Sequence, residues 1–142
     1  ELRLMFRSSG KSPAASTGVR RELDSRLTRY DEGSSQTIEE IQDMLDRNPN
    51  NESLLDWLAF MMYTNERFTE SLSLYRRLLE LNPDNATAHY YMANCFFKMG
   101  DVEKAILAWR RTMTLGPGSK IGRKAAARID MAKGLLAGER NF

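Results

Sequence analysis

The sequence has 142 residues, of which 42% are hydrophobic, and a formal net charge of +2. This size and composition suit one globular domain. With one cysteine and one histidine, the chain cannot form an intramolecular disulfide or a cysteine/histidine metal site. No apolar run approaches the roughly 18 residues that indicate a transmembrane helix. We therefore expect a soluble protein of a reducing compartment, such as the cytoplasm or an organelle matrix or stroma.

Charge is distributed unevenly along the chain. Residues 1–35 carry seven basic and five acidic side chains, and residues 36–117 carry eight basic and twelve acidic ones. Residues 118–142 carry six basic and two acidic side chains. The three segments therefore have net charges of +2, −4 and +4, so that an acidic middle lies between two basic ends.

The N-terminal segment is basic and rich in serine. Residues 2–21 contain no acidic residue, a composition similar to the end of an organellar transit peptide, in which case the chain derives from a precursor. A retained basic tail fits equally well. Low hydrophobicity predicts that residues 1–18 form an arm that is disordered alone and becomes ordered on a partner.

Two helices are predicted next. Val19–Asp31 places Leu23, Leu27 and Tyr30 on one face, and Thr37–Arg47 has its own apolar stripe. Thr37 and Glu40 have the spacing of a capping box at the start of the second helix. These helices would form residues 19–51, a first and irregular helix pair.

Three prolines mark a repeat. Pro49, Pro83 and Pro117 are separated by intervals of 34 residues, and each follows a helical pattern. Proline ends helices because it lacks an amide hydrogen and clashes with the preceding turn. The sequence therefore predicts two repeat units, at residues 52–85 and 86–119.

Each unit contains two stretches with apolar residues at helical spacing, separated by a polar turn. The turns are residues 64–67 and 98–101. Gly100 suits the end of a helix, where a left-handed backbone is needed. Asn51 and Asn85 follow prolines at positions suited to capping the next helix. Each unit is predicted to be a helix, a tight turn and a second helix.

The chain is predicted to end with one more helix, Lys120–Leu136. Ser119 could cap its start and Gly138 could follow its end. Its lysines and arginines give it a polar outer face, as a terminal helix of a repeat array requires. We therefore expect a capping helix at residues 120–137 and a tail at residues 138–142.

This organisation resembles the tetratricopeptide repeat family, which repeats every 34 residues. Nine residues occupy positions of the family pattern: Leu58, Ala59, Tyr75, Pro83, Met92, Ala93, Ala105, Trp109 and Pro117. Alanine replaces the family's glycine in both units, and the first-helix tryptophan is absent. The resemblance implies an all-α helical-repeat solenoid of about three helix pairs with a C-terminal capping helix.

The resemblance also implies a concave groove lined by the first helix of each pair. Its partner-binding residues would be Asp56, Phe60, Tyr63, Tyr90, Asn94, Phe97, Lys124 and Arg128. Alternatively, several of these aromatic residues pack between repeats. The positions at which chaperone-binding members clamp a carboxylate hold Asp56, Phe60, Tyr91, Ile121 and Ala125. Since none of them carries a positive charge, we do not expect capture of the acidic tails of heat-shock chaperones.

The sequence offers no catalytic constellation. His89 occupies a repeat position that is usually at least half-buried, which favours a structural role, and no glycine-rich phosphate loop is present. Cys95 fits a small core residue. We therefore expect no enzymatic activity, no cofactor, no metal and no small-molecule substrate.

These features favour a protein that binds other proteins, as an adaptor or accessory subunit of a larger complex. An assembly factor or chaperone-like protein for a membrane or organellar complex, including the cytochrome c maturation type, is an alternative. Contact with a membrane would then be indirect. A further alternative is RNA or ribosome association through the basic ends.

Overall fold

The computed structural model describes residues 34–140, which form six α-helices and no strand. The helices are α2 (Ser34–Arg47), α3 (Glu52–Thr64), α4 (Phe68–Leu81), α5 (Ala86–Lys98), α6 (Val102–Leu115) and α7 (Lys120–Arg140). The predicted all-α helical-repeat solenoid is thus confirmed for this part of the chain. None of these helices is long and apolar enough to cross a membrane.

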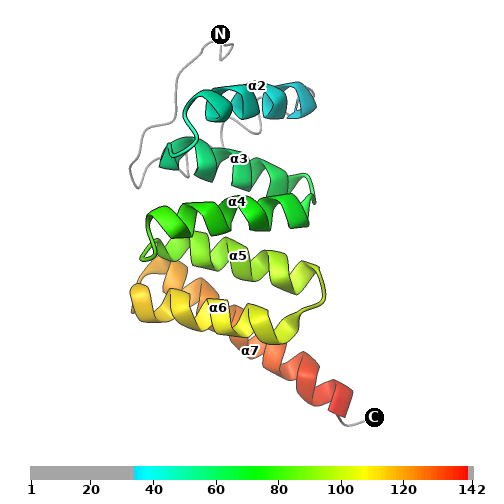
Figure 1. Cartoon of the computed structure of the whole chain (residues 1–142). Coiled ribbons are helices and arrows are strands. Elements are labelled where there is room, and N and C mark those ends of the chain that lie inside the picture. Colours follow the sequence, from blue (N-terminus) through cyan, green and yellow to red (C-terminus); the bar gives the residue numbers. More distant parts are fainter. Residues whose placement is uncertain (1–33, 141–142) are drawn as a thin grey trace.

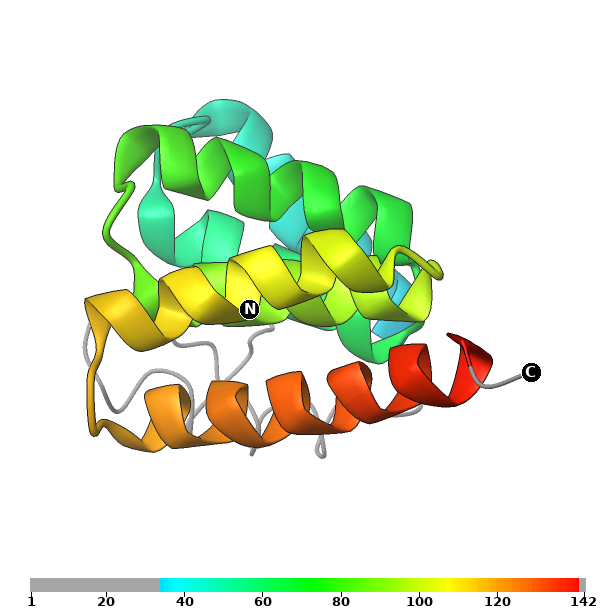
Figure 2. The same cartoon turned by 90° about the horizontal axis from the view of Figure 1, so that it is seen from below.

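The helices stack in chain order, each packing on the next (Figure 1). Seen from below, α4 and α7 lie at opposite edges of the molecule, with α5 and α6 between them (Figure 2). In addition to its neighbours in sequence, α5 contacts both α3 and α7. The first helix of each pair and α7 therefore share one face of the molecule, which we call the inner face.

The core consists of two clusters joined by the side chains of α5. One cluster surrounds Trp57 between α2, α3 and α4, and the other surrounds Trp109 between α5, α6 and α7. Tyr91 and Met92 pack against both clusters. Among the predicted repeat positions, six have no exposed surface: Leu58, Ala59, Tyr75, Ala93, Ala105 and Trp109. Met92 is half-buried, and Pro83 and Pro117 are exposed at the turns between repeats.

Side-chain caps begin three of the helices as the sequence predicts. The side-chain oxygens of Asn51 and Asn85 accept hydrogen bonds of 3.0 Å from the amides of Leu54 and Ala88. The Ser119 hydroxyl accepts one of 3.0 Å from the amide of Gly122. Each cap satisfies an amide hydrogen that the first turn of a helix leaves unpaired.

Two predicted helix ends are wrong. Helix α2 begins at Ser34, so Thr37 lies within the helix and does not start a capping box. Helix α7 continues through Gly138 to Arg140, because a glycine costs a helix only about 1 kcal/mol and no proline follows. The predicted arm at residues 1–18 and helix Val19–Asp31 lie outside the described residues.

The turns inside the two pairs have the same backbone geometry. Gly100 has φ +89°, as its predicted place at a helix end requires. Glu66, 34 residues earlier, has φ +62°. The repeat imposes a left-handed residue at this point, and in the first pair the chain supplies one that is not glycine.

Candidate partner-binding face

Helices α3, α5 and α7 carry the eight residues of the predicted groove. Asp56, Phe60 and Tyr63 lie on α3, Tyr90, Asn94 and Phe97 on α5, and Lys124 and Arg128 on α7. Asp56, Tyr63, Phe97 and Arg128 are half-buried and Lys124 is exposed, whereas Phe60, Tyr90 and Asn94 are buried. The inner face therefore combines accessible side chains with others that serve mainly to pack the repeats.

Tyr91 lies at the centre of the aromatic residues of this face. Its ring centroid is 5.2 Å from that of Phe60, 5.4 Å from that of Tyr63 and 5.1 Å from that of Tyr90. Phe60 and Tyr90 expose only 7% and 4% of their surface. The sequence placed Tyr91 at a clamp position of the family but did not predict it among the partner-binding residues. Its position beside Tyr90 in a run of two tyrosines was the available signal.

Asn94 joins the inner face to the core. Its Oδ1 atom accepts a hydrogen bond of 3.0 Å from the indole Nε1 of Trp109, and the residue is 2% exposed. Burial raises the pKa of the Tyr63 phenol, while the positive charge of Arg128 and a hydrogen bond with Asn94 oppose this rise. Asn94 therefore links Trp109 of α6 to the inner-face side of α5.

Positive charge adjoins these aromatic residues. The guanidinium of Arg128 lies 5.9 Å from the centre of the Tyr90 ring, a distance at which a cation is attracted to the ring's face. Lys124, one helical turn earlier, is exposed. On the same side, Phe97 packs against Trp109 with ring centroids 5.8 Å apart. The structure thus brings the predicted basic residues beside the predicted aromatic ones.

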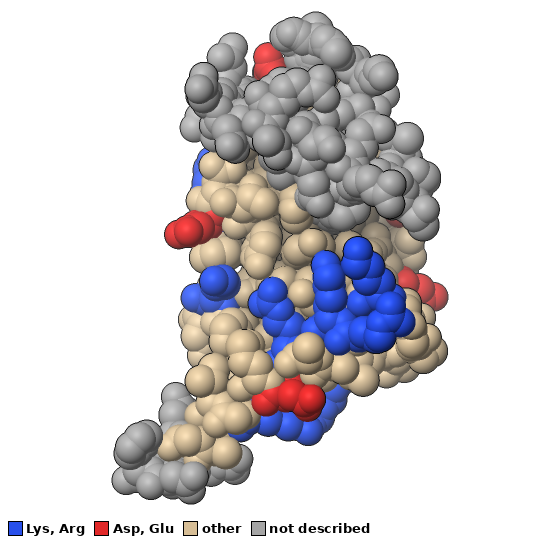
Figure 3. Space-filling model, turned by 180° about the vertical axis from the view of Figure 1, so that it is seen from behind, with Lys and Arg blue, Asp and Glu red and all other residues tan. Residues whose placement is uncertain are grey.

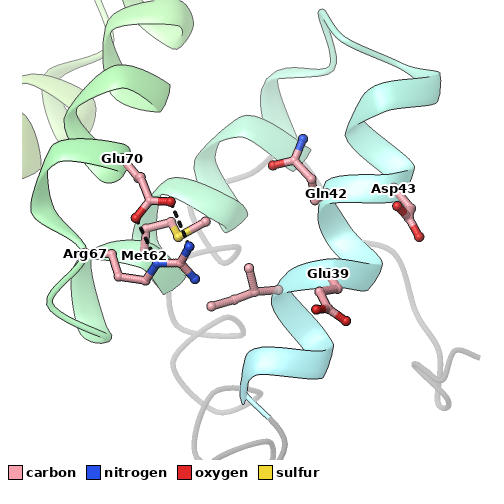
Figure 4. Close-up of a pocket in the computed structure, with 7 residues that line it drawn as sticks. Glu39, Gln42, Asp43, Met62, Arg67 and Glu70 are labelled. Carbon is pink, nitrogen blue, oxygen red and sulfur yellow. Dashed lines mark hydrogen bonds and ion pairs between the residues drawn. The ribbon is translucent and has the colours of Figure 1, made fainter.

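A separate pocket of about 410 Å³ lies between α2 and the start of α4 (Figure 4). Its lining residues are Ile38, Glu39, Gln42, Asp43, Met62, Arg67 and Glu70. Arg67 donates two hydrogen bonds, of 2.8 and 2.7 Å, to the carboxylate of Glu70, and these lower the pKa of Glu70. The sequence did not predict this pocket, because its walls come from separate helices.

The single histidine has a structural contact. The Nε2 atom of His89 lies 2.9 Å from the carbonyl oxygen of Pro83, so the ring is held at the turn between the two helix pairs. Among the described residues, no three His, Cys, Asp or Glu side chains are grouped so that they could hold a metal ion.

This arrangement of paired antiparallel helices defines a helical-repeat protein of the all-α class. The Tetratricopeptide repeat family model matches residues 63–120. This match and the fold agree with the tetratricopeptide resemblance that the sequence pattern indicates, and they place tetratricopeptide repeats within residues 63–120.

One sequence relative covers half of the chain. Over 75 residues, or 52% of this chain, the sequence is 35% identical to the Protein CTR9 homolog of Arabidopsis thaliana. The matched segment is only 7% of the length of that relative. The similarity therefore concerns a small part of that protein.

Solved structures share the fold at low sequence identity. The first tetratricopeptide domain of human RPAP3 has a TM-score of 0.70 and 19% identity, covering 84% of this chain and 93% of that one. The Yersinia enterocolitica type III secretion chaperone SycD, in complex with a peptide of the translocator YopD, has a TM-score of 0.68 and 10% identity. It covers 83% of this chain and 95% of that one. At these identities the likeness concerns the fold alone.

Proposed function

We propose that this protein is a protein–protein interaction module that binds an extended segment of a partner on its inner face. The observation that carries this proposal is the meeting of accessible aromatic and cationic side chains on that face. Tyr63, Phe97 and Arg128 are half-buried there and come from three different helices. Aromatic residues and arginine contribute most strongly to protein interfaces when they are partly buried beforehand and need little reordering.

The similar structures support this reading. The SycD structure contains a translocator peptide, and a further structure shows the first RPAP3 repeat domain bound to an HSP90 peptide. Peptide capture is thus compatible with this fold. Two positions at which carboxylate-clamp members carry polar or cationic side chains hold Asp56 and Phe60 in this chain. We therefore propose that its partner segment is not an acidic C-terminus.

The finer role that we propose is that of an adaptor or accessory subunit in a larger assembly. A chaperone-like assembly factor is a second candidate, which the fold shared with a secretion chaperone favours. The two roles differ in persistence: an accessory subunit stays in the finished complex, and an assembly factor leaves it. Comparing the co-migration of the protein with immature and mature complexes separates them.

The binding proposal can be tested with peptides selected from a random-sequence display library on the folded protein. Their binding sites are then mapped by amide chemical shifts in ¹⁵N-labelled protein. We expect perturbed amides in α3, α5 and α7, and affinity that falls about tenfold in Arg128→Ala, as for an interface anchor. Arg110→Ala, which removes an exposed arginine of α6, is the matched control and should bind as the unmodified protein does.

Circular dichroism and thermal unfolding establish that both variants remain folded. Selected peptides that perturb only α4 and α6, or that bind Arg128→Ala and the unmodified protein equally, would contradict the proposal. The first of these results would place binding on the opposite face of the stack, and the second would show that Arg128 does not anchor the partner.

A further inference from the structure

We infer, on the basis of the proposed function, that the partner segment is acidic at one end and apolar at the other, and that it lies along α7. Its carboxylates would pair with Lys120, Lys124 and Arg128. Its apolar side chains would cover Met131 and Leu135. We call this surface, formed by these five residues, the α7 stripe. It does not include the carboxylate-clamp positions considered above, because the clamp positions on α7 are Ile121 and Ala125.

The first observation is an excess of cations without carboxylate partners. Helix α7 carries Lys120, Arg123, Lys124, Arg128 and Lys133, against a single acidic residue, Asp130, among its described side chains. The ion pairs found among the described residues involve Arg67, Lys104 and Arg111, and none involves a cation of α7. Viewed from behind, the molecule shows lysine and arginine side chains gathered in one area (Figure 3). Charge of one sign favours a partner of the opposite sign.

The second observation is the direction of these side chains. Lys120, Lys124 and Arg128 are spaced four residues apart, so they lie in one row on the helix surface. The contact of Arg128 with Tyr90 shows that this row borders the inner face. At its start, the positive end of the helix dipole of α7 adds to the positive potential. The basic half of the α7 stripe therefore continues the inner face.

The third observation is that the row becomes apolar after Arg128. Met131 and Leu135 follow it at spacings of three and four residues, and they are 43% and 50% exposed. A nucleic acid would satisfy the cations and leave these two side chains in water, whereas a peptide can meet both halves. The sequence of charges along α7 therefore fits a protein segment better than RNA.

The test uses the full chain and a random 12-residue peptide library. Peptides selected at low salt should be enriched in Asp and Glu in one half and in Leu, Ile or Phe in the other. We expect Lys124→Glu to weaken their binding about fivefold, since it replaces an exposed ion pair by repulsion. Met131→Gln/Leu135→Gln should weaken binding about tenfold through lost apolar contact.

Matched variants on the opposite side of the stack serve as controls. Arg110→Glu makes the same charge change at an exposed site of α6, and Leu107→Gln removes an apolar side chain that is 63% exposed there. Both should retain full affinity. If Lys124→Glu does not fold, Lys120→Glu gives the same measurement one turn earlier.

Several results would overturn the inference. Selected peptides could be neutral or basic, or Lys124→Glu could behave as Arg110→Glu does. Polyuridylate could also bind through Lys124 while acidic peptides do not bind. The basic half of the α7 stripe would then be an RNA-binding surface. If non-acidic peptides still map to the inner face, only the inference fails. If no peptide binds that face, the proposed function fails as well.

Discussion

The indole Nε1 of Trp109 on α6 donates a hydrogen bond of 3.0 Å to the side-chain oxygen of Asn94 on α5. Both residues are buried, at 0% and 2% exposure. The bond fixes the second helix pair and also orients Asn94 beneath the inner face. An asparagine at a predicted groove position is thus engaged by the core.

Replacing Asn94 by alanine should lower the free energy of unfolding by about 2 kcal/mol, because the buried indole donor loses its acceptor. Urea denaturation followed by tryptophan fluorescence measures the change. Trp109→Phe removes the donor, so the double variant should be destabilised by less than the sum of the single variants. Full additivity would show that this hydrogen bond contributes no coupling.

The left-handed turn residues allow a second prediction. At Gly100 an added Cβ would meet no atom within 4 Å, so Gly100→Ala tests the backbone conformation alone and should cost about 1 kcal/mol. Glu66→Gly should instead stabilise the protein by up to about 0.5 kcal/mol. Glycine removes the backbone strain of a side-chain-bearing residue at φ +62°, and this gain exceeds the extra conformational entropy that glycine gives the unfolded chain. Thermal unfolding of both variants gives the answer, and changes of equal sign would refute the explanation.

The glycines of α7 should respond in opposite ways. A Cβ on Gly122 would collide with the carbonyl oxygen of Gly116, whereas one on Gly134 would meet nothing within 4 Å. We expect Gly122→Ala to destabilise the α6–α7 junction by about 2 kcal/mol, as in overpacking. Gly134→Ala should stabilise the exposed helix by roughly 0.8 kcal/mol. Calorimetric midpoints distinguish these outcomes, and tolerance of alanine at Gly122 would mean that the junction can move.

The helix caps give a further test. Asn51→Ala and Asn85→Ala should each lower the free energy of unfolding by about 1 kcal/mol, while serine at either position should restore most of it. Denaturant titration of all four variants measures this. If serine destabilises as much as alanine does, the asparagines act through something other than capping.

Cys95 should be chemically inert in the folded protein. Burial raises the pKa of its thiol, and a hydrogen bond with Ser71 only partly opposes this rise. Because the folded state favours the neutral thiol, the stability associated with this group is complete below the thiol's unfolded pKa. That stability falls as the pH rises toward the higher folded pKa.

The reaction of Cys95 with Ellman's reagent at pH 8 should therefore occur at the rate of unfolding. A Cys95→Ser variant supplies the blank. Rapid modification of the native protein, independent of denaturant, would contradict the burial that the structure shows.

The sequence by itself determined the helices and their order in the repeats, because those features depend on residues close together in the chain. The 34-residue interval between prolines, the asparagine caps and the left-handed position at Gly100 are all local. The same reasoning was less reliable at helix ends. A glycine such as Gly138 is a stop signal only when the packing around it permits one.

Only the tertiary structure decided which side chains of the inner face remain accessible. Phe60, Tyr63, Tyr90 and Asn94 were all predicted to line the groove, yet Tyr63 is half-buried and the others are buried. Tyr91 became the centre of the aromatic cluster, and Arg128 came to lie over Tyr90. These outcomes depend on how neighbouring helices cross and on which side chains fill the space between them. Such contacts join residues far apart in sequence, so periodicity along one helix does not determine them.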